Sequence, residues 1–580
     1  MIKNKMNSYN IVKWEMVVLI ILLIFPHLQY SKIPGTSTDE FGYIYHSINM
    51  LGWDWKALYE YYPFYGAGIS LLWIPMFKIL SYLPTTTMYQ AIVVLNAVLL
   101  SLSFLVSLKC AEKLFNKWNN WARLFSCFVL SFYPSNYFYA RLALSETLLY
   151  LMFWILLCLL IKFLETKKTY WMFLLGITSS YMVLVHLRTT GIVVILGVFI
   201  VYISLKNENR FLNILSFFIP IVVGVILLLM IQNNYYENLG GINEANIQNT
   251  QINVGNLFLN IIINIKSALL GGTGHIFYYL ISGGICGFCG IVYLLKKCIT
   301  YIKKIRMKQK EDIYDLVSIF LLFTFVLNFI AFYIRPHEYI SRYDVALYGR
   351  YMENIMGPIL LYGLYYLETK RKCLEHLYIF LLVCCTPILI RILENSGEAI
   401  FSADSAPAVG GFFLFDMTNQ SIDFSVLKIL CVGIIFSIFC WGICQFWLKY
   451  KEKRNFNKII MSSIIMLMAV YWGYLGIQSE NVFTGKRMEL YYEYNSIKKE
   501  IDKLSPSNII FVQNEPNSRN NVKYLQFLLG EESIKVEKLN YLESIGDEEL
   551  VLCEKKDVLN ILIEKGFNKK EYSKLDLYYK

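Results

Sequence analysis

Long apolar runs are the feature of this 580-residue sequence that most limits the folds open to it. A helix needs about 20 apolar residues to cross the roughly 30 Å hydrocarbon core of a bilayer, and runs of that length recur along most of the chain. Only 17% of the residues are charged, against roughly 25% in ordinary soluble domains. Because the apolar runs alternate with short charged clusters, the sequence predicts an all-α polytopic membrane protein.

Thirteen segments have the length and character of a transmembrane helix. The predicted spans are residues 14–31, 86–108, 122–139, 146–164, 170–187, 190–206, 211–231, 273–295, 313–333, 351–368, 375–393, 426–448 and 458–477. A further apolar segment, residues 66–83, is interrupted and bordered by prolines, and we interpret it as an interfacial or re-entrant element. If it crossed the membrane, every later connector would change sides.

The basic residues predict how these spans are oriented. With residues 66–83 not crossing, alternate connectors hold almost all the Lys and Arg residues, as the positive-inside rule requires of cytoplasmic connectors. We therefore expect a plasma-membrane protein whose N-terminus is cytoplasmic. The residues expected outside the membrane are 32–85, 232–272, 334–350, 394–425 and everything after 478.

The last hundred residues differ in character from the rest. We expect a membrane domain over residues 1–480 and a small soluble extracytoplasmic α/β domain over 481–580, since strand-like and helix-like segments alternate there. The strand-like segments are Asn508–Val512, Ser533–Glu537, Leu550–Leu552 and Leu575–Tyr578, and the helix-like segments are Arg487–Leu504 and Val558–Lys565. No Gly-rich phosphate loop occurs in this region of the sequence.

Composition also excludes other classes of protein. The formal net charge of +11 comes from residues in the connectors, so a nucleic-acid-binding face is not predicted. Most of the thirteen cysteines lie in apolar runs, where they act as small hydrophobic residues. The pair Cys286 and Cys289 lies in a Gly-rich span, and we interpret it as a helix-packing feature rather than a metal or redox site.

Charged residues at the predicted ends of spans are the candidate functional residues, because a charge in or beside lipid is costly and is usually paired or functional. Those expected on the outer face include Asp39, Glu40, Arg141, Glu146, Arg188 and Arg350. Each also has a simpler interpretation as a solvated loop residue. For Asp39, Glu146 and Arg350 we favour a functional role, since all three lie at the mouth of a span and face one compartment.

This combination of residue types indicates a particular chemistry. A carboxylate beside cations and partly shielded from water can serve as a general base. Arginine binds phosphate oxygens through two parallel hydrogen bonds. A carboxylate and phosphate-binding arginines at one membrane face predict a phosphorylated amphiphile as substrate, and an activated lipid-phosphate donor fits best.

Several short motifs resemble the membrane glycosyltransferases of the C-type fold, in the branch of protein O-mannosyltransferases and aminoarabinose lipid A transferases. The motifs are Asp39–Tyr43 after the first span, Gly52–Trp53, the Pro- and Tyr-rich stretch Tyr61–Pro75, Ser145–Glu146, and Gly349–Tyr351 followed by Pro358. The resemblance extends over most of the chain in topology. It implies transfer of a hexose or pentose from a polyprenyl-phosphate sugar to an extracytoplasmic acceptor, with inversion of configuration.

The resemblance also implies roles for individual residues. Asp39 would be the base, Glu40 would orient it or hold the acceptor, and Glu146 would be a second acidic group near the reaction centre. Arg350, with Arg188 or Arg141, would bind the donor phosphate. The sugar and acceptor pocket would include Tyr43, His46, Tyr62 and Tyr351.

The expected partners are the lipid-linked donor, membrane lipids and a cell-envelope glycan, lipid or protein as acceptor, with no nucleic acid. Some branches of the superfamily use a divalent metal, but no clear ligand set emerges from the sequence, and we predict no cofactor.

Two other functions remain open at this point. A flippase or other transporter of lipid-linked oligosaccharide would need similar charges, but it should show paired repeats and charges near the midplane of several spans. A polymerase or ligase of lipid-linked oligosaccharide would carry its main charges in a large late loop, and residues 334–350 keep that possibility open. A non-catalytic scaffold would leave the clustered charges unexplained.

Overall fold

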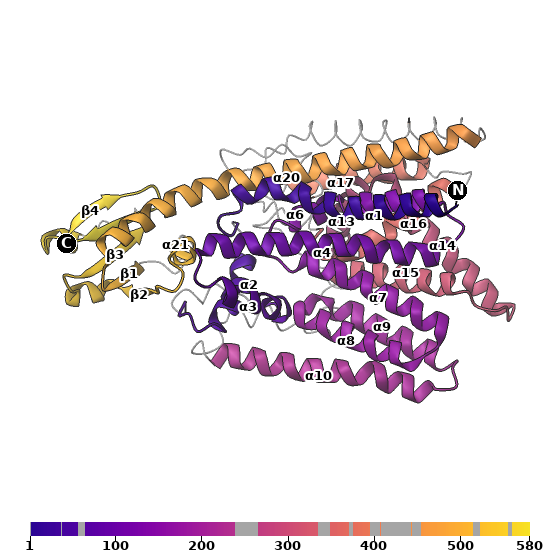
Figure 1. Ribbon diagram of the computed structural model, residues 1–580, viewed down its shortest axis with the longest axis horizontal. Helices are drawn as coiled ribbons and strands as arrows, with labels where there is room; N and C mark the ends of the chain where they lie inside the picture. The colour runs from indigo at the N-terminus through magenta and orange to yellow at the C-terminus, as the bar shows by residue number, and fades with distance from the viewer. Residues whose placement is uncertain are drawn as a thin grey trace.

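The computed structural model describes residues 2–35, 38–55, 64–237, 265–333, 349–369, 375–394, 407, 442, 454–513, 522–554 and 560–580. The chain forms an elongated bundle of helices with a small β-sheet at one end, and the N-terminus lies at the other end of the molecule (Figure 1). Seven helices in the described ranges are long and apolar enough to cross a membrane. The protein is therefore a multi-pass membrane protein, as the apolar runs predict.

The helices of the bundle follow the predicted spans closely. They are α1 (Ile2–Ile24), η1 (Phe25–Tyr30), α4 (Thr85–Leu114), α5 (Asn120–Leu130), α6 (Pro134–Tyr139), α7 (Glu146–Thr166), α8 (Thr169–Val185), η3 (Leu187–Thr189), α9 (Thr190–Ser204), α10 (Arg210–Glu237), α13 (Ile265–Ser282), α14 (Gly284–Arg306), α15 (Ile313–Tyr333), α16 (Glu353–Thr369), α17 (Glu375–Glu394) and α20 (Arg454–Leu504). Apart from residue 442, the predicted span 426–448 lies outside the described residues, so the total of thirteen stays a prediction.

Two predicted spans are each divided into two α-helices. The segment 122–139 breaks before Pro134, which begins α6 because proline has no N–H to donate to the preceding turn. The segment 273–295 is divided between α13 and α14, and Gly284 has a φ of +54° at the division. That region of backbone conformation is open to glycine without steric cost.

Two short helices lie at the end of the bundle that is nearest the sheet (Figure 1). Helix α2 (Thr38–Asn49) follows the first span, and α3 (Gly68–Leu80) lies within the segment predicted to be interfacial or re-entrant. The 13 residues of α3 give a length of about 20 Å, which is less than the hydrocarbon core of a bilayer. Helix α3 also contains Pro75.

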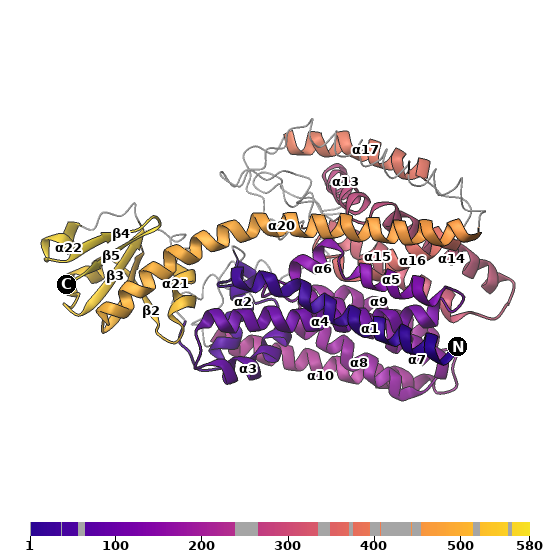
Figure 2. The ribbon, with the colours of Figure 1, turned by 45° about the horizontal axis from the view of Figure 1, so that its top comes forward.

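Helix α20 joins the bundle to the C-terminal sheet. Its 51 residues make it roughly 75 Å long, and Figure 2 shows it running from the bundle to the sheet without a break. The boundary predicted near residue 480 lies inside this helix. Charged residues are frequent after residue 478 of the helix and rare in the twenty residues before it, so the change in composition marks where α20 leaves the apolar segment.

The C-terminal sheet has five strands in the order β2-β1-β3-β5-β4. They are β1 (Asn508–Gln513), β2 (Ile534–Lys538), β3 (Glu549–Glu554), β4 (Asn568–Glu571) and β5 (Leu575–Tyr579). Strand β1 is parallel to β2 and β3, whereas β5 is antiparallel to β3 and β4. The four predicted strands agree within two residues at each end, and the short helix α22 (Asn560–Glu564) lies within the predicted helix-like segment. Strand β4 and helix α21 (Val522–Leu529) were not predicted.

Alternating residues of the sheet contribute to two different cores. Phe511 and Leu552 belong to the same hydrophobic cluster as the bundle, while Ile510 and Val551 pack with Leu562 of α22 on the other face. This alternation follows from the two-residue period of a strand. One face of the sheet is thus continuous with the core of the membrane domain.

Candidate active site

Helix α2 places three of the predicted site residues on one stripe. Asp39, Tyr43 and His46 are separated by four and three positions, a spacing that puts side chains on the same side of a helix. Asp39 and Glu40 lie in the first turn of α2, where a negative charge interacts favourably with the helix dipole. The acidic pair is therefore compatible with the helix that carries it.

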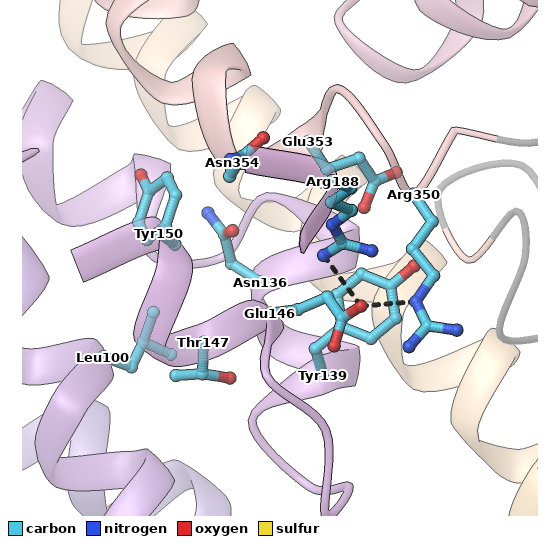
Figure 3. Close-up of a pocket in the computed structure, with 10 residues that line it drawn as sticks. All are labelled: Leu100, Asn136, Tyr139, Glu146, Thr147, Tyr150, Arg188, Arg350, Glu353 and Asn354. Carbon is cyan, nitrogen blue, oxygen red and sulfur yellow. Dashed lines mark hydrogen bonds and ion pairs between the residues drawn. The ribbon is translucent and has the colours of Figure 1, made fainter. Parts of the chain in front are cut away.

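Four of the predicted residues form one network of ion pairs. Glu146, the first residue of α7, accepts a hydrogen bond of 2.9 Å from Arg188 Nη2, and the same oxygen accepts one from Arg350 Nε. Arg350 also donates through Nη1 to Asp39 Oδ2. Figure 3 shows both arginines converging on Glu146. Residues from α2, η3, α7 and the segment before α16 meet at this point.

The side chains of the network are not equally exposed to solvent. The side chains of Glu146, Arg188 and Arg350 are 4 to 5% exposed, whereas that of Asp39 is 17% exposed. Electrostatic attraction is stronger in such a shielded position than at a surface. Within this network Asp39 is thus the most accessible group, and the arginines lie behind it.

Tyr65 binds one oxygen of Asp39, and Arg350 binds the other. Its hydroxyl donates a hydrogen bond of 2.9 Å to Asp39 Oδ1, and its ring stacks on His186 with a centroid distance of 5.3 Å. Gly66 permits this placement, because its φ is +147° and a Cβ there would lie 2.4 Å from the Leu184 carbonyl oxygen. Tyr65 lies in the Pro- and Tyr-rich stretch but was not singled out from the sequence.

The turn before α9 fixes Arg188. The Nδ1 atom of His186 accepts a hydrogen bond of 3.2 Å from the Arg188 backbone N–H, and so caps this turn. The Arg188 guanidinium lies 5.9 Å from the ring centroid of Tyr351. Tyr351 is thus next to a phosphate-binding candidate, and its predicted role in the sugar or acceptor pocket stays a prediction.

A small internal cavity lies beside this network. Its volume is about 10 Å³, room for about one water molecule. It is lined by Leu100, Asn136, Tyr139, Glu146, Thr147, Tyr150, Arg188, Arg350, Glu353 and Asn354, and Figure 3 shows these side chains around it. Most of the lining residues carry a polar or charged group, although the surrounding helices are apolar.

Glu353 is a residue of this site that sequence reasoning missed. It is buried, and its Oε1 accepts a hydrogen bond from the Tyr278 hydroxyl. It lies three positions after Arg350, at the start of the apolar helix α16. Glu146 was identified as a carboxylate at the mouth of a predicted span. Glu353 lies near the start of the predicted span 351–368, so the same criterion could have identified it.

Glu40 lies apart from the network, in the interior. One of its oxygens accepts a hydrogen bond of 2.5 Å from Gly35 N, and the other accepts bonds of 2.6 Å from Tyr89 Oη and 2.8 Å from Ala143 N. Burial raises the pKa of Glu40, and the positive charge of Arg487 with these three donors opposes the rise. Glu40 thereby ties α2 to α4 and to the segment before α7.

The other predicted residues have different surroundings. The Tyr43 hydroxyl shares a hydrogen bond of 3.0 Å with Ser145 Oγ, next to Glu146. The Arg141 guanidinium carbon lies 3.8 Å from the centroid of the Tyr137 ring and is buried. Tyr62 lies outside the described residues.

His46 is enclosed by aromatic rings. Its ring centroid lies 5.4 Å from that of Tyr235 and 5.7 Å from that of Phe64. Burial lowers the pKa of His46 to about 4, so the imidazole is neutral at physiological pH. An aromatic enclosure with a neutral imidazole is compatible with the predicted pocket for a sugar or acceptor.

In the described ranges, no group of three or more His, Cys, Asp or Glu side chains is arranged to hold a metal ion. The charged network instead consists of two carboxylates and two guanidinium groups. Guanidinium groups are suited to binding phosphate oxygens. The arrangement can thus bind an anion beside a carboxylate that has access to solvent.

Comparisons with known proteins identify the fold. No protein-family model matches the chain, and no curated protein sequence matches it. The structure is similar to ArnT from Cupriavidus metallidurans bound to undecaprenyl phosphate, with a TM-score of 0.52 and 11% identity over 98% of both chains. For ArnT in the apo state the TM-score is 0.51, with 10% identity over 99% of this chain and 98% of that one. The chain therefore has the C-type glycosyltransferase fold, as the motifs predicted.

Proposed function

We propose that this chain is an integral-membrane glycosyltransferase that moves a sugar from a polyprenyl-phosphate donor to an acceptor at the membrane surface. The observation that carries the proposal is the network in which Arg350 joins Asp39 to Glu146 and Arg188. It combines a partly exposed carboxylate with two arginines that can bind a phosphate. A solved structure with the same fold, ArnT, has undecaprenyl phosphate bound, which supports a lipid phosphate as the donor's leaving group.

In this proposal Asp39 acts as the general base. It takes the proton of an acceptor hydroxyl or amine as the oxygen or nitrogen attacks the anomeric carbon of the donor. The bond between that carbon and the phosphate oxygen breaks, and its electron pair leaves with polyprenyl phosphate. Attack from the side opposite the leaving group inverts the configuration. The 17% exposure of the Asp39 side chain is what allows an acceptor to reach it.

Arg350 and Arg188 stabilise the leaving phosphate. Negative charge grows on this group as the bond breaks, and donors that are already in place lower the barrier without having to reorganise. Glu146 keeps both guanidinium groups in place through a single oxygen. A bound phosphate would compete with Asp39 for the Nη1 group of Arg350, and donor binding would thereby release the base for its proton transfer.

The proposed orientation follows from the basic connectors and places this site outside the cytoplasm. Helix α2 and the C-terminal sheet lie at the same end of the bundle, and the N-terminus lies at the other (Figure 1). With the N-terminus in the cytoplasm, both the site and the sheet would be extracytoplasmic. A lipid-linked donor presents its sugar at that surface, and the acceptor would be an envelope glycan, lipid or protein.

A transfer assay tests the proposal. Purified protein in liposomes is given a panel of polyprenyl-phosphate hexoses and pentoses with labelled sugars, together with an envelope extract as acceptor. The proposal predicts transfer of label and release of polyprenyl phosphate with at least one donor, and none from liposomes without the protein. Movement of a labelled lipid-linked oligosaccharide across the bilayer, with no release from any donor, would instead identify a transporter. Joining of lipid-linked oligosaccharides to one another would identify a polymerase or ligase.

A further inference from the structure

Helix α21 lies between the C-terminal sheet and the helix bundle. All eight of its residues are buried, and it packs against α20 and against the start of α4. Figure 1 places it at the end of the bundle where α2 and α4 begin. It therefore packs against the membrane domain as well as belonging to the C-terminal domain.

Two hydrogen bonds join α21 and its C-cap glycine to the segment that flanks α2. The Tyr524 hydroxyl donates to the Gly35 carbonyl oxygen at 3.3 Å, just before α2 begins. The Trp55 indole N–H donates to the Gly530 carbonyl oxygen at 2.7 Å, six residues after α2 ends. The helix that carries the proposed base is thus held at both ends by the C-terminal domain.

Aromatic contacts extend this attachment to α2 itself. The rings of Phe41 and Tyr524 form a T-shaped pair with a centroid distance of 5.3 Å, and Lys523 Nζ lies 5.2 Å from the centroid of the Phe41 ring. Phe41 is completely buried and follows Asp39 by two positions. Such aromatic pairs stabilise a contact beyond the effect of the area that they bury.

The same segment is attached on its inner side through Glu40. The Gly35 N–H donates to Glu40, while the Gly35 carbonyl accepts from Tyr524. Tyr89 donates to Glu40 and meets the Phe527 ring of α21 at 6.3 Å. Gly35 and Tyr89 therefore each contact both Glu40 and the C-terminal domain.

Helix α2 depends on contacts of this kind. It has 12 residues, and isolated helices of this length are marginal in water. It also contains Gly42, which is an unfavourable residue inside a helix. Tertiary contacts must therefore stabilise α2 and fix the position of Asp39.

We infer that the C-terminal domain positions the active centre, and that Tyr524 and Trp55 are positioning residues that fix α2 and hence Asp39. The effect on catalysis rests on the proposed function. The attachment of α2 to the C-terminal domain does not depend on it. Neither side chain touches the ion-pair network. They act through the hydrogen bonds on both sides of α2 and, for Tyr524, also through the ring of Phe41.

Hydrogen exchange of the full-length protein in detergent micelles tests the inference. Tyr524→Phe keeps the ring and removes the hydroxyl, and Trp55→Phe removes the indole donor. Tyr541→Phe is the matched control, because the Tyr541 hydroxyl bonds Glu549 within the C-terminal domain. We expect amides of residues 38–49 to exchange at least about fivefold faster in the first two variants, and at the wild-type rate in the control. Wild-type exchange over residues 38–49 in both test variants would overturn the inference.

Kinetics separate positioning from general stability. In a working transfer assay, we expect Tyr524→Phe to lower kcat at least about fivefold while the KM for the donor changes less than twofold, since the arginines are not disturbed. An equal loss in Tyr541→Phe would overturn the positioning role. If the wild type transfers no sugar, the proposed function fails, and the exchange experiment still decides whether the domain holds α2. Should Trp55→Phe not fold, Tyr524→Phe carries the test, because it removes a single hydroxyl.

Discussion

Arg350 and Asp39 are 311 positions apart in the sequence, and their side chains form an ion pair. The same guanidinium reaches Glu146 through its Nε. One arginine thus connects the helix after the first span to the helix that begins at Glu146. The proposed base and the proposed phosphate-binding groups are parts of one structure.

The two contacts of Arg350 use different nitrogen atoms, and a lysine has only one. We therefore expect Arg350→Lys to lower kcat/KM for the donor at least about tenfold, although the charge is retained. Steady-state transfer assays with a labelled donor measure the change. Arg306→Lys, at an exposed position at the end of α14, is the control and should retain wild-type kinetics. Retention of activity in Arg350→Lys would mean that the paired geometry is unimportant.

Glu146 should matter for stability as well as for activity. Glu146→Gln leaves two buried guanidinium groups without their shared carboxylate, and breaking a buried pair costs roughly 3–5 kcal/mol. We expect a clear fall in the Tm of the detergent-solubilised protein. Glu165→Gln, at the other end of α7, removes ion pairs whose side chains are 27 to 43% exposed, and such pairs contribute about 1 kcal/mol or less. Equal Tm losses in the two variants would contradict the buried network.

The buried imidazole of His46 predicts a dependence of stability on pH. Its pKa of about 4 in the folded protein lies below the ordinary value of about 6.5, so the unfolded chain binds a proton more readily. This contribution to stability is complete above pH 6.5 and is lost as the pH falls toward 4. We expect the Tm of His46→Phe to fall less than that of the wild type between pH 7 and pH 4.5.

His376→Phe controls for this measurement, because His376 is exposed. It should show the same pH dependence of Tm as the wild type. Parallel curves for the wild type and His46→Phe would show that His46 does not contribute in this range.

Chelation tests the prediction that no metal is needed. In the proposal Arg350 and Arg188 supply the positive charge at the leaving phosphate. We therefore expect transfer activity to stay within about twofold of its starting value after treatment with EDTA and dialysis. A loss that Mg²⁺ or Mn²⁺ restores would place a metal in the reaction.

Much of the fold follows from local sequence patterns. The apolar runs predict most of the helices, because about 20 apolar residues between charged clusters have few other structures open to them. The breaks at Pro134 and Gly284 were missed, since apolar character continues across both. The short strand β4, with the sequence NKKE, carries no apolar alternation and takes its structure from pairing with β5.

The candidate site was predictable in part. Charges at span ends identified Asp39, Glu146, Arg188 and Arg350, because lipid makes such charges costly. The pairing between them depends on how distant helices pack, which local patterns do not contain. Glu40 was predicted to act with Asp39 because the two are adjacent in the sequence. In a helix, however, the side chains of adjacent residues point in different directions. The structure places Glu40 in the interior with three backbone and side-chain donors.

Substitution of the proposed base tests the central claim most directly. Asp39→Asn keeps the size of the side chain and its hydrogen bond from Tyr65, and removes the group that accepts the proton. Asp54→Asn is the matched control, since Asp54 is exposed in the segment that follows α2. With equal amounts of folded protein in liposomes, we predict that Asp39→Asn lowers release of polyprenyl phosphate at least about a hundredfold, while Asp54→Asn releases it at the wild-type rate. Release by Asp39→Asn at the wild-type rate would contradict the account.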